Sequence, residues 1–289
     1  MPTAPAQDAG VPRTLHHSSF PPARIAAAKH ERVTVCLPAR ECAGTVGEVV
    51  SALVPLRAEG VLDEILVVDA ASRDGTAEVA AAAGARVVQE AELMPSYGPV
   101  LGKGDAMWRA LGACGGEIVC FLDADTEGFS AHFASGLIGA LVCEPGLEFA
   151  KAFYRRPLGD SADGGGRVNH LLARPALALF YPELAGVRQP LAGEVAARRG
   201  LLERLPFATG YGVEIGMLID AWRAVGLEGL GQVDLDEHRN PHKPLSELEP
   251  MARTVLATIA ARVAEEGRLQ GAGEGPAERP ALASLAEAA

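Results

Sequence analysis

Two aspartates one residue apart, Asp123 and Asp125, follow a short apolar run in the stretch FLDADTEG, residues 121–128. Alternate side chains of an extended segment point to opposite sides, but where the chain bends at a strand end both carboxylates can approach one ion. Mg²⁺ and Mn²⁺ prefer hard oxygen ligands and usually share them with substrate phosphates. The spacing therefore predicts a divalent metal site that faces a diphosphate, with an acidic turn as the plain alternative.

Two further stretches carry groups that bind anions. Lys103 lies between two glycines in GKGDAMW, at the start of an expected helix, where backbone N–H groups favour negative charge. The spacing is not that of a P-loop. The stretch GGGRVNH, residues 164–170, combines a glycine loop, a helix start and Arg167, which are the parts of a phosphate or carboxylate cradle. A solvated lysine and a flexible linker are the respective alternatives.

Three other polar residues are candidates for the same site. His238, in the stretch DEHRN, offers a nitrogen ligand that would complete a metal shell, although a lone histidine is more often an ordinary polar residue. Asp69 ends an apolar strand and could accept hydrogen bonds from a base or a ribose, or simply begin a loop. Glu214, in GYGVEIG, could orient a sugar hydroxyl or could be an ordinary acidic charge at a helix start.

The elements that must position these residues alternate along the first half of the chain. Strands are expected at 32–38, 63–70, 85–90 and 117–125, separated by helices at 45–56, 74–84 and 103–114. This rhythm predicts an α/β fold with a doubly wound, mainly parallel sheet. Ligands of such sheets bind at the carboxyl ends of the strands, where Pro38, Asp69 and Asp123 fall.

The second half of the chain has a different pattern. Strands are expected at 148–157 and within 187–199, helices at about 168–180, 210–226 and 246–265, and a polar loop at 234–245. Residues 1–30 and 267–289, which are rich in Ala, Pro and polar residues, are expected to be a flexible arm and a flexible tail. Within the arm, the stretch HHSSF at 16–20 is the one part that could dock on the folded chain.

Composition limits the class of protein. The 289 residues carry a formal net charge of −11, which argues against a nucleic-acid partner. No run of 18 apolar residues appears, so no membrane partner is expected. The N-terminus lacks the residue order of a signal peptide, which predicts a cytoplasmic location. The five cysteines have no zinc-like spacing, and Cys36 and Cys120 are expected in the core.

Taken together, the stretches resemble the glucosyl-3-phosphoglycerate synthases, retaining glycosyltransferases with a Rossmann-like GT-A fold for nucleotide-diphospho-sugars. The resemblance covers about residues 16–263. It is carried, in chain order, by LPA at 37–39, D-x-x-S-x-D at 69–74, GKGDAMWRAL, DAD, KAFYRRP, GGGRVNHL, QPLAGE, PFATGYGVEIG and EHRN. It implies a donor-binding half at 31–145 and an acceptor-binding half, with a C-terminal helix, at 146–266.

The resemblance also implies roles for residues of this chain. A Mg²⁺ ion, with Mn²⁺ as a possible substitute, is expected on Asp125 and His238. The expected donor pocket consists of Pro38, Ala39, Arg40, Asp69, Ala70, Lys103, Asp123 and Ala124. The expected acceptor contacts are Gly166, Arg167, Asn169, Tyr211 and Asn240. Glu214, Asp125 and Lys103 are the expected catalytic residues.

The implied reaction moves glucose from UDP-glucose, or another nucleotide-glucose, to the 2-hydroxyl of 3-phospho-D-glycerate, within a homodimer. The resemblance implies that the acceptor hydroxyl attacks the sugar from the same face that the leaving phosphate departs from. Three positions depart from the family pattern: Cys42 replaces a usual Glu, Asn169 a usual Thr, and Asp236 a commonly basic residue. They leave mannosyl transfer from GDP-mannose as an alternative. A nucleotidyltransferase is only a remote alternative. Such enzymes carry a glycine- and arginine-rich loop directly after the first strand, and the stretch LPAREC at that place has no glycine.

Overall fold

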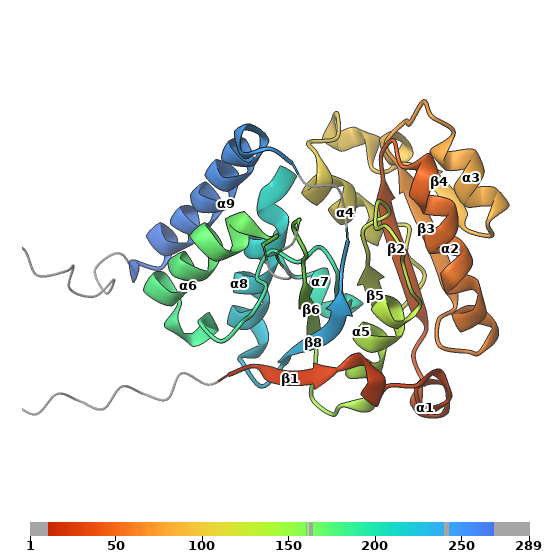
Figure 1. Ribbon diagram of the computed structural model, residues 1–289, viewed down its shortest axis with the longest axis horizontal. Coiled ribbons are helices and arrows are strands. Elements are labelled where there is room, and N and C mark those ends of the chain that lie inside the picture. Colours follow the sequence, from red (N-terminus) through yellow and green to blue (C-terminus); the bar gives the residue numbers. More distant parts are fainter. Residues whose placement is uncertain (1–10, 160, 162–163, 240–242, 269–289) are drawn as a thin grey trace, which may run out of the picture.

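The computed structural model describes residues 11–159, 161, 164–239 and 243–268 (Figure 1). The strands are β1 (Arg13–His16), β2 (Val33–Ala39), β3 (Glu64–Asp69), β4 (Arg86–Gln89), β5 (Ile118–Phe121), β6 (Phe149–Arg155), β7 (Val195–Arg198) and β8 (Leu230–Glu237). The α-helices are α1 (Pro22–Ala28), α2 (Ala43–Ala58), α3 (Thr76–Ala82), α4 (Lys103–Leu111), α5 (His132–Cys143), α6 (Arg174–Phe180), α7 (Arg199–Leu202), α8 (Val213–Val225) and α9 (Leu245–Glu265).

All eight strands form one sheet in the order β1-β8-β6-β7-β5-β2-β3-β4. Neighbouring strands pair in parallel except around β7, which is antiparallel to both β5 and β6. The central strands β2 and β5 are buried on both faces, as expected for parallel strands that helices cover on two sides. The predicted doubly wound, mainly parallel α/β fold is confirmed.

Two apolar cores lie on the two faces of this sheet. One core contains buried residues of α1, α2, α3 and α5, including Ile25, Val49 and Leu137. The other contains buried residues of α4, α6, α8 and α9, including Met107 and Ile259. In Figure 1, α6, α8 and α9 form one group beside the sheet, while α2 and α3 lie at the β3–β4 end.

The N-terminal segment differs from the prediction of a flexible arm over residues 1–30. Residues 13–16 form β1, which pairs in parallel with β8, and residues 22–28 form α1. Phe20 and Ile25 are almost fully buried against α5. The prediction of a flexible arm is therefore wrong for residues 13–15 and 21–28, whereas HHSSF at 16–20, the one part expected to dock, does pack against the fold through Phe20. Residues 1–10 and most of the expected tail lie outside the described part of the chain.

Outside the N-terminal segment, the sequence prediction also missed α5, α7 and β8. Residues 234–237, expected in a polar loop, are the end of β8, and the segment 132–143, to which no element was assigned, is the helix α5. α5 contains Gly136 and Gly139, where close neighbours leave no room for a Cβ atom. These glycines allow α5 to pack tightly against the N-terminal segment.

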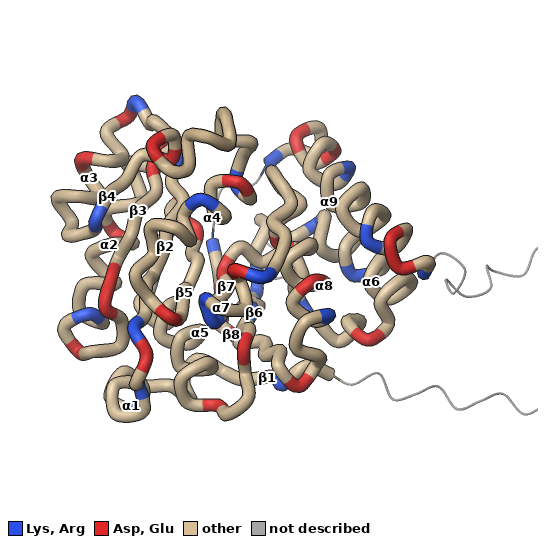
Figure 2. Tube along the Cα trace, turned by 180° about the vertical axis from the view of Figure 1, so that it is seen from behind, with Lys and Arg blue, Asp and Glu red and all other residues tan. Residues whose placement is uncertain are grey.

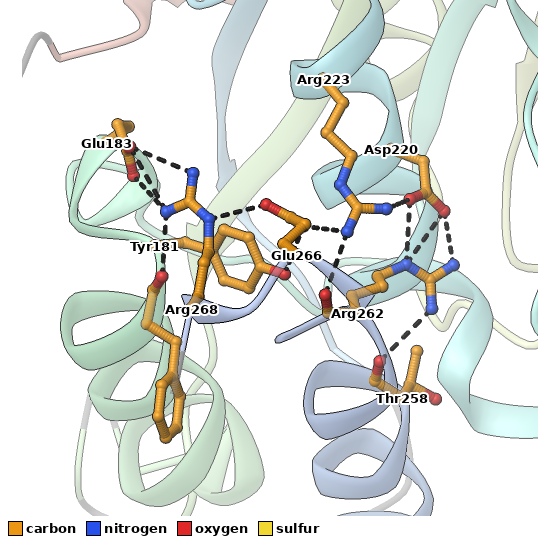
Figure 3. Close-up of polar contacts among 9 residues, drawn as sticks. Tyr181, Glu183, Asp220, Arg223, Thr258, Arg262, Glu266 and Arg268 are labelled. Atoms are coloured by element: carbon orange, nitrogen blue, oxygen red, sulfur yellow. Dashed lines mark hydrogen bonds and ion pairs between the residues drawn. The ribbon is translucent and has the colours of Figure 1, made fainter. Parts of the chain in front are cut away.

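Ion pairs fasten the C-terminal end of α9 to α8 and to the segment after α6 (Figure 3). Arg262 of α9 places Nε 3.0 Å from both carboxylate oxygens of Asp220, which lies in α8. Just after α9, Arg268 pairs with Glu183 at 3.2 Å. Because Asp220 and Arg262 are both nearly buried, this contact fixes how α9 lies over the rest of the fold.

Charge is spread over the molecule. Figure 2 shows Asp and Glu interspersed with Lys and Arg along both halves of the trace. Within the described ranges, no helix has the length and apolar character needed to cross a membrane.

Candidate active site

A cavity of about 660 Å³ lies where the carboxyl ends of β2 and β5 meet the second half of the chain. It is lined by thirteen residues that the sequence predicted for the site: Pro38, Ala39, Arg40, Ala70, Lys103, Asp123, Ala124, Asp125, Gly166, Arg167, Asn169, Tyr211 and Glu214. Segments far apart in the chain thus converge on one space. Leu248, Met251 and Val255 of α9 add apolar lining.

Lys103 joins two acidic residues at the bottom of this cavity. Its Nζ lies 2.6 Å from Asp123 Oδ1 and 3.0 Å from Glu214 Oε1. Burial alone would lower the pKa of Lys103, but the two carboxylates outweigh it and hold the pKa well above its usual value. Lys103 is therefore a permanent cation, which can stabilise negative charge that develops nearby.

The glycines beside Lys103 explain how it reaches this position. A Cβ atom on Gly104 would lie 1.9 Å from the Ala208 carbonyl oxygen, so only glycine lets the start of α4 approach the loop before α8. Gly102 has a φ of +87°, in the region that glycine adopts without strain. The GKG stretch thus places the first turn of α4 beside Glu214.

Asp125 lies in the turn that follows β5, at the side of the cavity. Burial raises the pKa of its carboxyl, and the nearby negative charge of Asp123 adds to the rise, while the charge of Lys103 and, to a smaller extent, that of His238 oppose it. A cation beside Asp125 would relieve this repulsion. The environment therefore fits the carboxylate ligand of a divalent ion.

His238 lies just behind the cavity wall, stacked on the ring of Tyr154 with centroids 4.5 Å apart. Its Nε2 is 2.9 Å from Glu194 Oε1 and 3.2 Å from Thr126 Oγ1. Its Nδ1 is buried and has no hydrogen-bond partner among the described residues. A histidine that places one nitrogen beside a buried carboxylate, and whose other nitrogen has no hydrogen-bond partner among the described residues, has an arrangement that fits a metal ligand. His238 therefore fits the predicted role.

A buried polar cluster beneath the cavity was missed from the sequence. Glu194 is 1% exposed and accepts a hydrogen bond from Tyr154 Oη at 2.8 Å. Burial alone would raise the pKa of Glu194, but His238 outweighs it and lowers the pKa. Lys151, also buried, donates to the Ala192 carbonyl at 2.8 Å, and burial lowers its pKa to about 8. The stretch QPLAGE contains Glu194, but a sequence pattern does not show which residue its carboxylate faces.

The donor side contains the ends of β2 and β3. Asp69 itself does not line the cavity. It is buried at the end of β3, where Oδ2 accepts from Ser72 N at 3.1 Å and from Gln89 Nε2 at 3.0 Å. Its Oδ1 is buried without a hydrogen-bond partner in the described part of the chain. The next residue but one, Ala71, has a φ of +53°, a strained value for alanine. Asp69 thus shapes this turn and keeps one acceptor atom available.

The acceptor side is basic. Arg156, Arg167 and Lys243 all line it, and Arg167 Nη2 donates to the Lys243 carbonyl at 2.5 Å. Lys243 Nζ in turn lies 3.2 Å from Tyr211 Oη. Cations grouped at one end of a cavity favour a phosphate or carboxylate.

Two of the predicted acceptor residues, Asn169 and Asn240, are not seen as free groups facing the cavity. The side chain of Asn169 donates to the Arg188 carbonyl at 3.3 Å and accepts from Leu191 N at 3.4 Å, so its amide group is already engaged. Asn240 lies outside the described residues.

The fold and the cavity define the class of protein. Residues 34–131 match the family described as Glycosyl transferase family 2. The mixed sheet and the site at its carboxyl edge are those of the GT-A fold, so the chain is a hexosyltransferase of that fold.

Known proteins narrow the family further. The chain is 44% identical over 260 residues to the glucosyl-3-phosphoglycerate synthase of Mycolicibacterium paratuberculosis, a match that covers 86% of this chain and 78% of that protein. The chain therefore belongs to the glucosyl-3-phosphoglycerate synthase family.

Two solved structures are also similar. A mannosyl-3-phosphoglycerate synthase from Rubrobacter xylanophilus is 47% identical with a TM-score of 0.84, over 89% of this chain and 82% of that one. A glucosyl-3-phosphoglycerate synthase from Mycobacterium tuberculosis, in complex with Mn²⁺, UDP-glucose and phosphoglyceric acid, is 42% identical with a TM-score of 0.80, over 87% of each chain. Relatives at these identities thus differ in the hexose that they are named for.

Proposed function

We propose that this protein transfers glucose from UDP-glucose to the 2-hydroxyl of 3-phospho-D-glycerate, with retention of the anomeric configuration and with Mg²⁺ or Mn²⁺ as cofactor. The observation that carries the proposal is the charge pattern of one cavity. All four charged residues that matter line this cavity. Asp123 and Asp125 come from the donor half of the chain, and Arg156 and Arg167 come from the acceptor half. A metal-bound diphosphate suits the first pair and an anionic acceptor suits the second.

The donor diphosphate would be held through Asp125 and His238. These two residues would hold an ion that would supply positive charge for the leaving diphosphate. Lys103 adds a fixed positive charge from the start of α4, where the N–H groups of the first helical turn would also favour an anion. Pro38, Ala39, Arg40, Ala70 and Ala124 would line the pocket of the nucleoside. The available Oδ1 of Asp69 would accept from the base through a small shift of the turn.

The acceptor would lie with its phosphate against Arg167 and the Gly166 backbone. Gly166 has a φ of +66°, which turns the loop ahead of the π-helical turn Asn169–Ala173. Asn240 would add a polar contact, and Tyr211 would close the side of the cavity near Lys243. These contacts hold the 2-hydroxyl near the donor sugar, which contributes through orientation.

Retention would follow from attack on the same face, with the leaving phosphate taking the acceptor proton. Glu214 is the carboxylate that the resemblance assigns to the sugar, but it is paired with Lys103 at 3.0 Å. Such a pairing suits a residue that orients a sugar hydroxyl better than a nucleophile. We expect Glu214→Gln to lower turnover and to leave a measurable remnant, whereas a trapped glycosyl ester on Glu214 would contradict this mechanism.

The test is release of nucleoside diphosphate from the purified protein, comparing UDP-glucose, GDP-glucose and GDP-mannose, each with 3-phosphoglycerate and Mg²⁺. We expect UDP release that requires both acceptor and metal, and NMR of the product should show retention. Preference for GDP-mannose would identify the protein as a mannosyl transferase and give weight to Cys42 and Asp236, where it departs from the family pattern. No release with any donor, by folded protein that binds UDP, would overturn the acceptor assignment.

Arg167→Met provides the matched test of the acceptor site. The loss of a charge-assisted contact to phosphate should raise the KM for 3-phosphoglycerate by about tenfold or more. Arg174→Met is the control, because Arg174 is exposed and does not line the cavity. By the same resemblance we infer a homodimer, which light scattering would test, and we also propose a cytoplasmic location, which cell fractionation would test.

A further inference from the structure

A second group of potential metal ligands lies outside the cavity, at the ends of the edge strands β1 and β8. His16, His17 and Asp236 each offer one ligand atom, and these atoms all lie within 4.8 Å of one another. His16 Nε2 is 3.3 Å from Asp236 Oδ1, and His17 Nε2 is 2.7 Å from Asp236 Oδ2. Residues some 220 positions apart in the chain thus aim two imidazoles at one carboxylate.

The backbone explains why Asp236 faces the histidines. In the pairing of β6 with β8, Phe153 lies opposite Asp234 and Arg155 lies opposite Glu237, so β8 contains one extra residue. Within this bulge, Asp236 has a φ of +64°, a left-handed value that is unfavourable for most residues other than glycine and that Asp and Asn adopt more readily than the rest. Bulges redirect side chains and are frequent next to functional sites.

The Nε2 atoms of both histidines face Asp236, so these are the atoms that would bind an ion. His16 Nδ1 lies 2.8 Å from Ser18 Oγ, which can accept its proton when Nε2 binds an ion. In the present arrangement the Ser18 backbone N–H also points at Nδ1, at 3.2 Å, so ion binding requires a change of tautomer. The ring of His132 packs on His17 with centroids 4.2 Å apart and fixes its position.

The geometry points to a binding site for a borderline divalent cation such as Zn²⁺ on His16, His17 and Asp236. Two imidazoles and one carboxylate are typical zinc ligands, whereas Mg²⁺ prefers oxygen. Ligand atoms around tetrahedral zinc are separated by about 3.3–3.6 Å, so the contact of His16 with Asp236 already matches and that of His17 must open slightly. The side chains of His16 and Asp236 are 44% and 54% exposed, which leaves the fourth position to water.

Such an ion would link β1 to the bulge of β8. Because β8 ends one residue before His238, the ion would also restrain the segment that carries this predicted ligand of the catalytic metal. The inference does not depend on the proposed transferase reaction, since none of the three residues lines the cavity.

The test uses the full chain with Asp125→Ala, which removes the expected ligand of the catalytic metal. Zn²⁺ is titrated in competition with a chromophoric chelator, in excess Mg²⁺. We expect one equivalent of bound Zn²⁺ and a rise in Tm. When Asp236→Asn is introduced into the Asp125→Ala protein, the affinity for Zn²⁺ should fall by at least about tenfold. Asparagine also tolerates a left-handed φ, so this variant should keep its fold.

His16→Gln is the second test variant, and His30→Gln is the matched control, because His30 is exposed and is not part of the cluster. Zinc affinity should fall in the former and stay unchanged in the latter. Co²⁺ in place of Zn²⁺ should give the visible absorption of a tetrahedral site. Absence of Zn²⁺ binding to the Asp125→Ala protein, or binding that Asp236→Asn does not weaken, would overturn the inference.

Discussion

Lys103 shows how a single residue connects the two halves of the site. It lies on α4 of the donor half, contacts Asp123 after β5, and reaches Glu214 at the start of α8 in the other half. Lys103→Met should therefore lower kcat/KM by about 100–1000-fold, as expected when one electrostatic contact to the transition state is lost. Steady-state kinetics with the best donor measures this effect.

The control for Lys103 is Lys29→Met. Lys29 pairs with Asp63 at 2.6 Å, and neither residue lines the cavity. This variant should keep kcat/KM within about twofold of wild type, in line with additivity for distant sites. A folded Lys103→Met protein with nearly normal kcat/KM would contradict a direct role for the cation.

Glu194 allows the metal assignment to be tested without turnover. It contacts His238 Nε2 at 2.9 Å and leaves Nδ1 for the ion. Glu194→Gln keeps the size of the side chain but removes its charge, so the affinity for Mn²⁺ should fall by about 10–100-fold. Electron paramagnetic resonance of free Mn²⁺ measures the affinity directly. Glu214→Gln is the control and should bind Mn²⁺ normally; equal affinities in both variants would show that Glu194 does not support a metal ligand.

At the residue scale, the sequence predicted which side chains line the site better than it predicted which groups those side chains contact. Asp125, Lys103 and Arg167 were recognised because their types and neighbours match a chemistry, and all three line the cavity. Glu194 and Lys151 were missed, because their effect depends on complete burial and on contacts between separate strands. The amide of Asn169 was expected to face the acceptor, yet it is hydrogen-bonded to the backbone of residues 188 and 191.

Among the elements, β3 begins at a carboxylate that joins three strands. Glu64 accepts hydrogen bonds from Thr34 Oγ1 of β2 at 2.6 Å, from Gly115 N at 2.9 Å and from Arg86 of β4 at 2.8 and 2.9 Å. Burial alone would raise the pKa of Glu64, but these hydrogen bonds outweigh it and lower the pKa.

The lowered pKa gives a prediction about pH. A carboxyl whose pKa is lower in the folded state stabilises the fold above its unfolded pKa, and this contribution is lost as the pH falls through the folded pKa. Glu64→Gln should lower the free energy of unfolding by about 1–3 kcal/mol near pH 7. The difference from wild type should shrink as the pH falls below about 4.5. Urea unfolding between neutral and acid pH measures it, and a pH-independent difference would contradict this account.

Element prediction succeeded where local patterns and topology agree. The strands β2, β3 and β5 read as short apolar runs, and each was predicted to overlap its observed position. The end of β8 was assigned to a loop because its sequence, DLDE, is mostly acidic. The bulge at Asp236 and the neighbouring strand β1 explain the acidity, and neither can be inferred from the local residues.

At the scale of the whole molecule, the N-terminal segment closes the fold. β1 adds an edge strand beside β8, and the segment that follows it packs on α5, on the face of the sheet that also carries α2. The sequence prediction treated residues 1–30 as an arm because no sustained periodicity is present there. Burial of Phe20 and Ile25 depends on glycines some 115 residues further along, which a local pattern does not show.

Gly139 of α5 tests whether this segment is an integral part of the fold. A Cβ atom at this position would lie 2.3 Å from Phe20 Cβ, so Gly139→Ala forces the two elements apart and should cost about 1–3 kcal/mol of unfolding free energy. Gly44→Ala in α2 is the control: nothing lies within 4 Å of the added atom, and the helix should gain up to about 1 kcal/mol. If residues 13–28 were a loose arm in solution, both substitutions would stabilise the protein alike. Introducing Phe20→Gly first should remove most of the cost of Gly139→Ala, because it removes both Phe20 atoms that the new methyl group would meet, and a double-mutant cycle from urea unfolding measures that coupling.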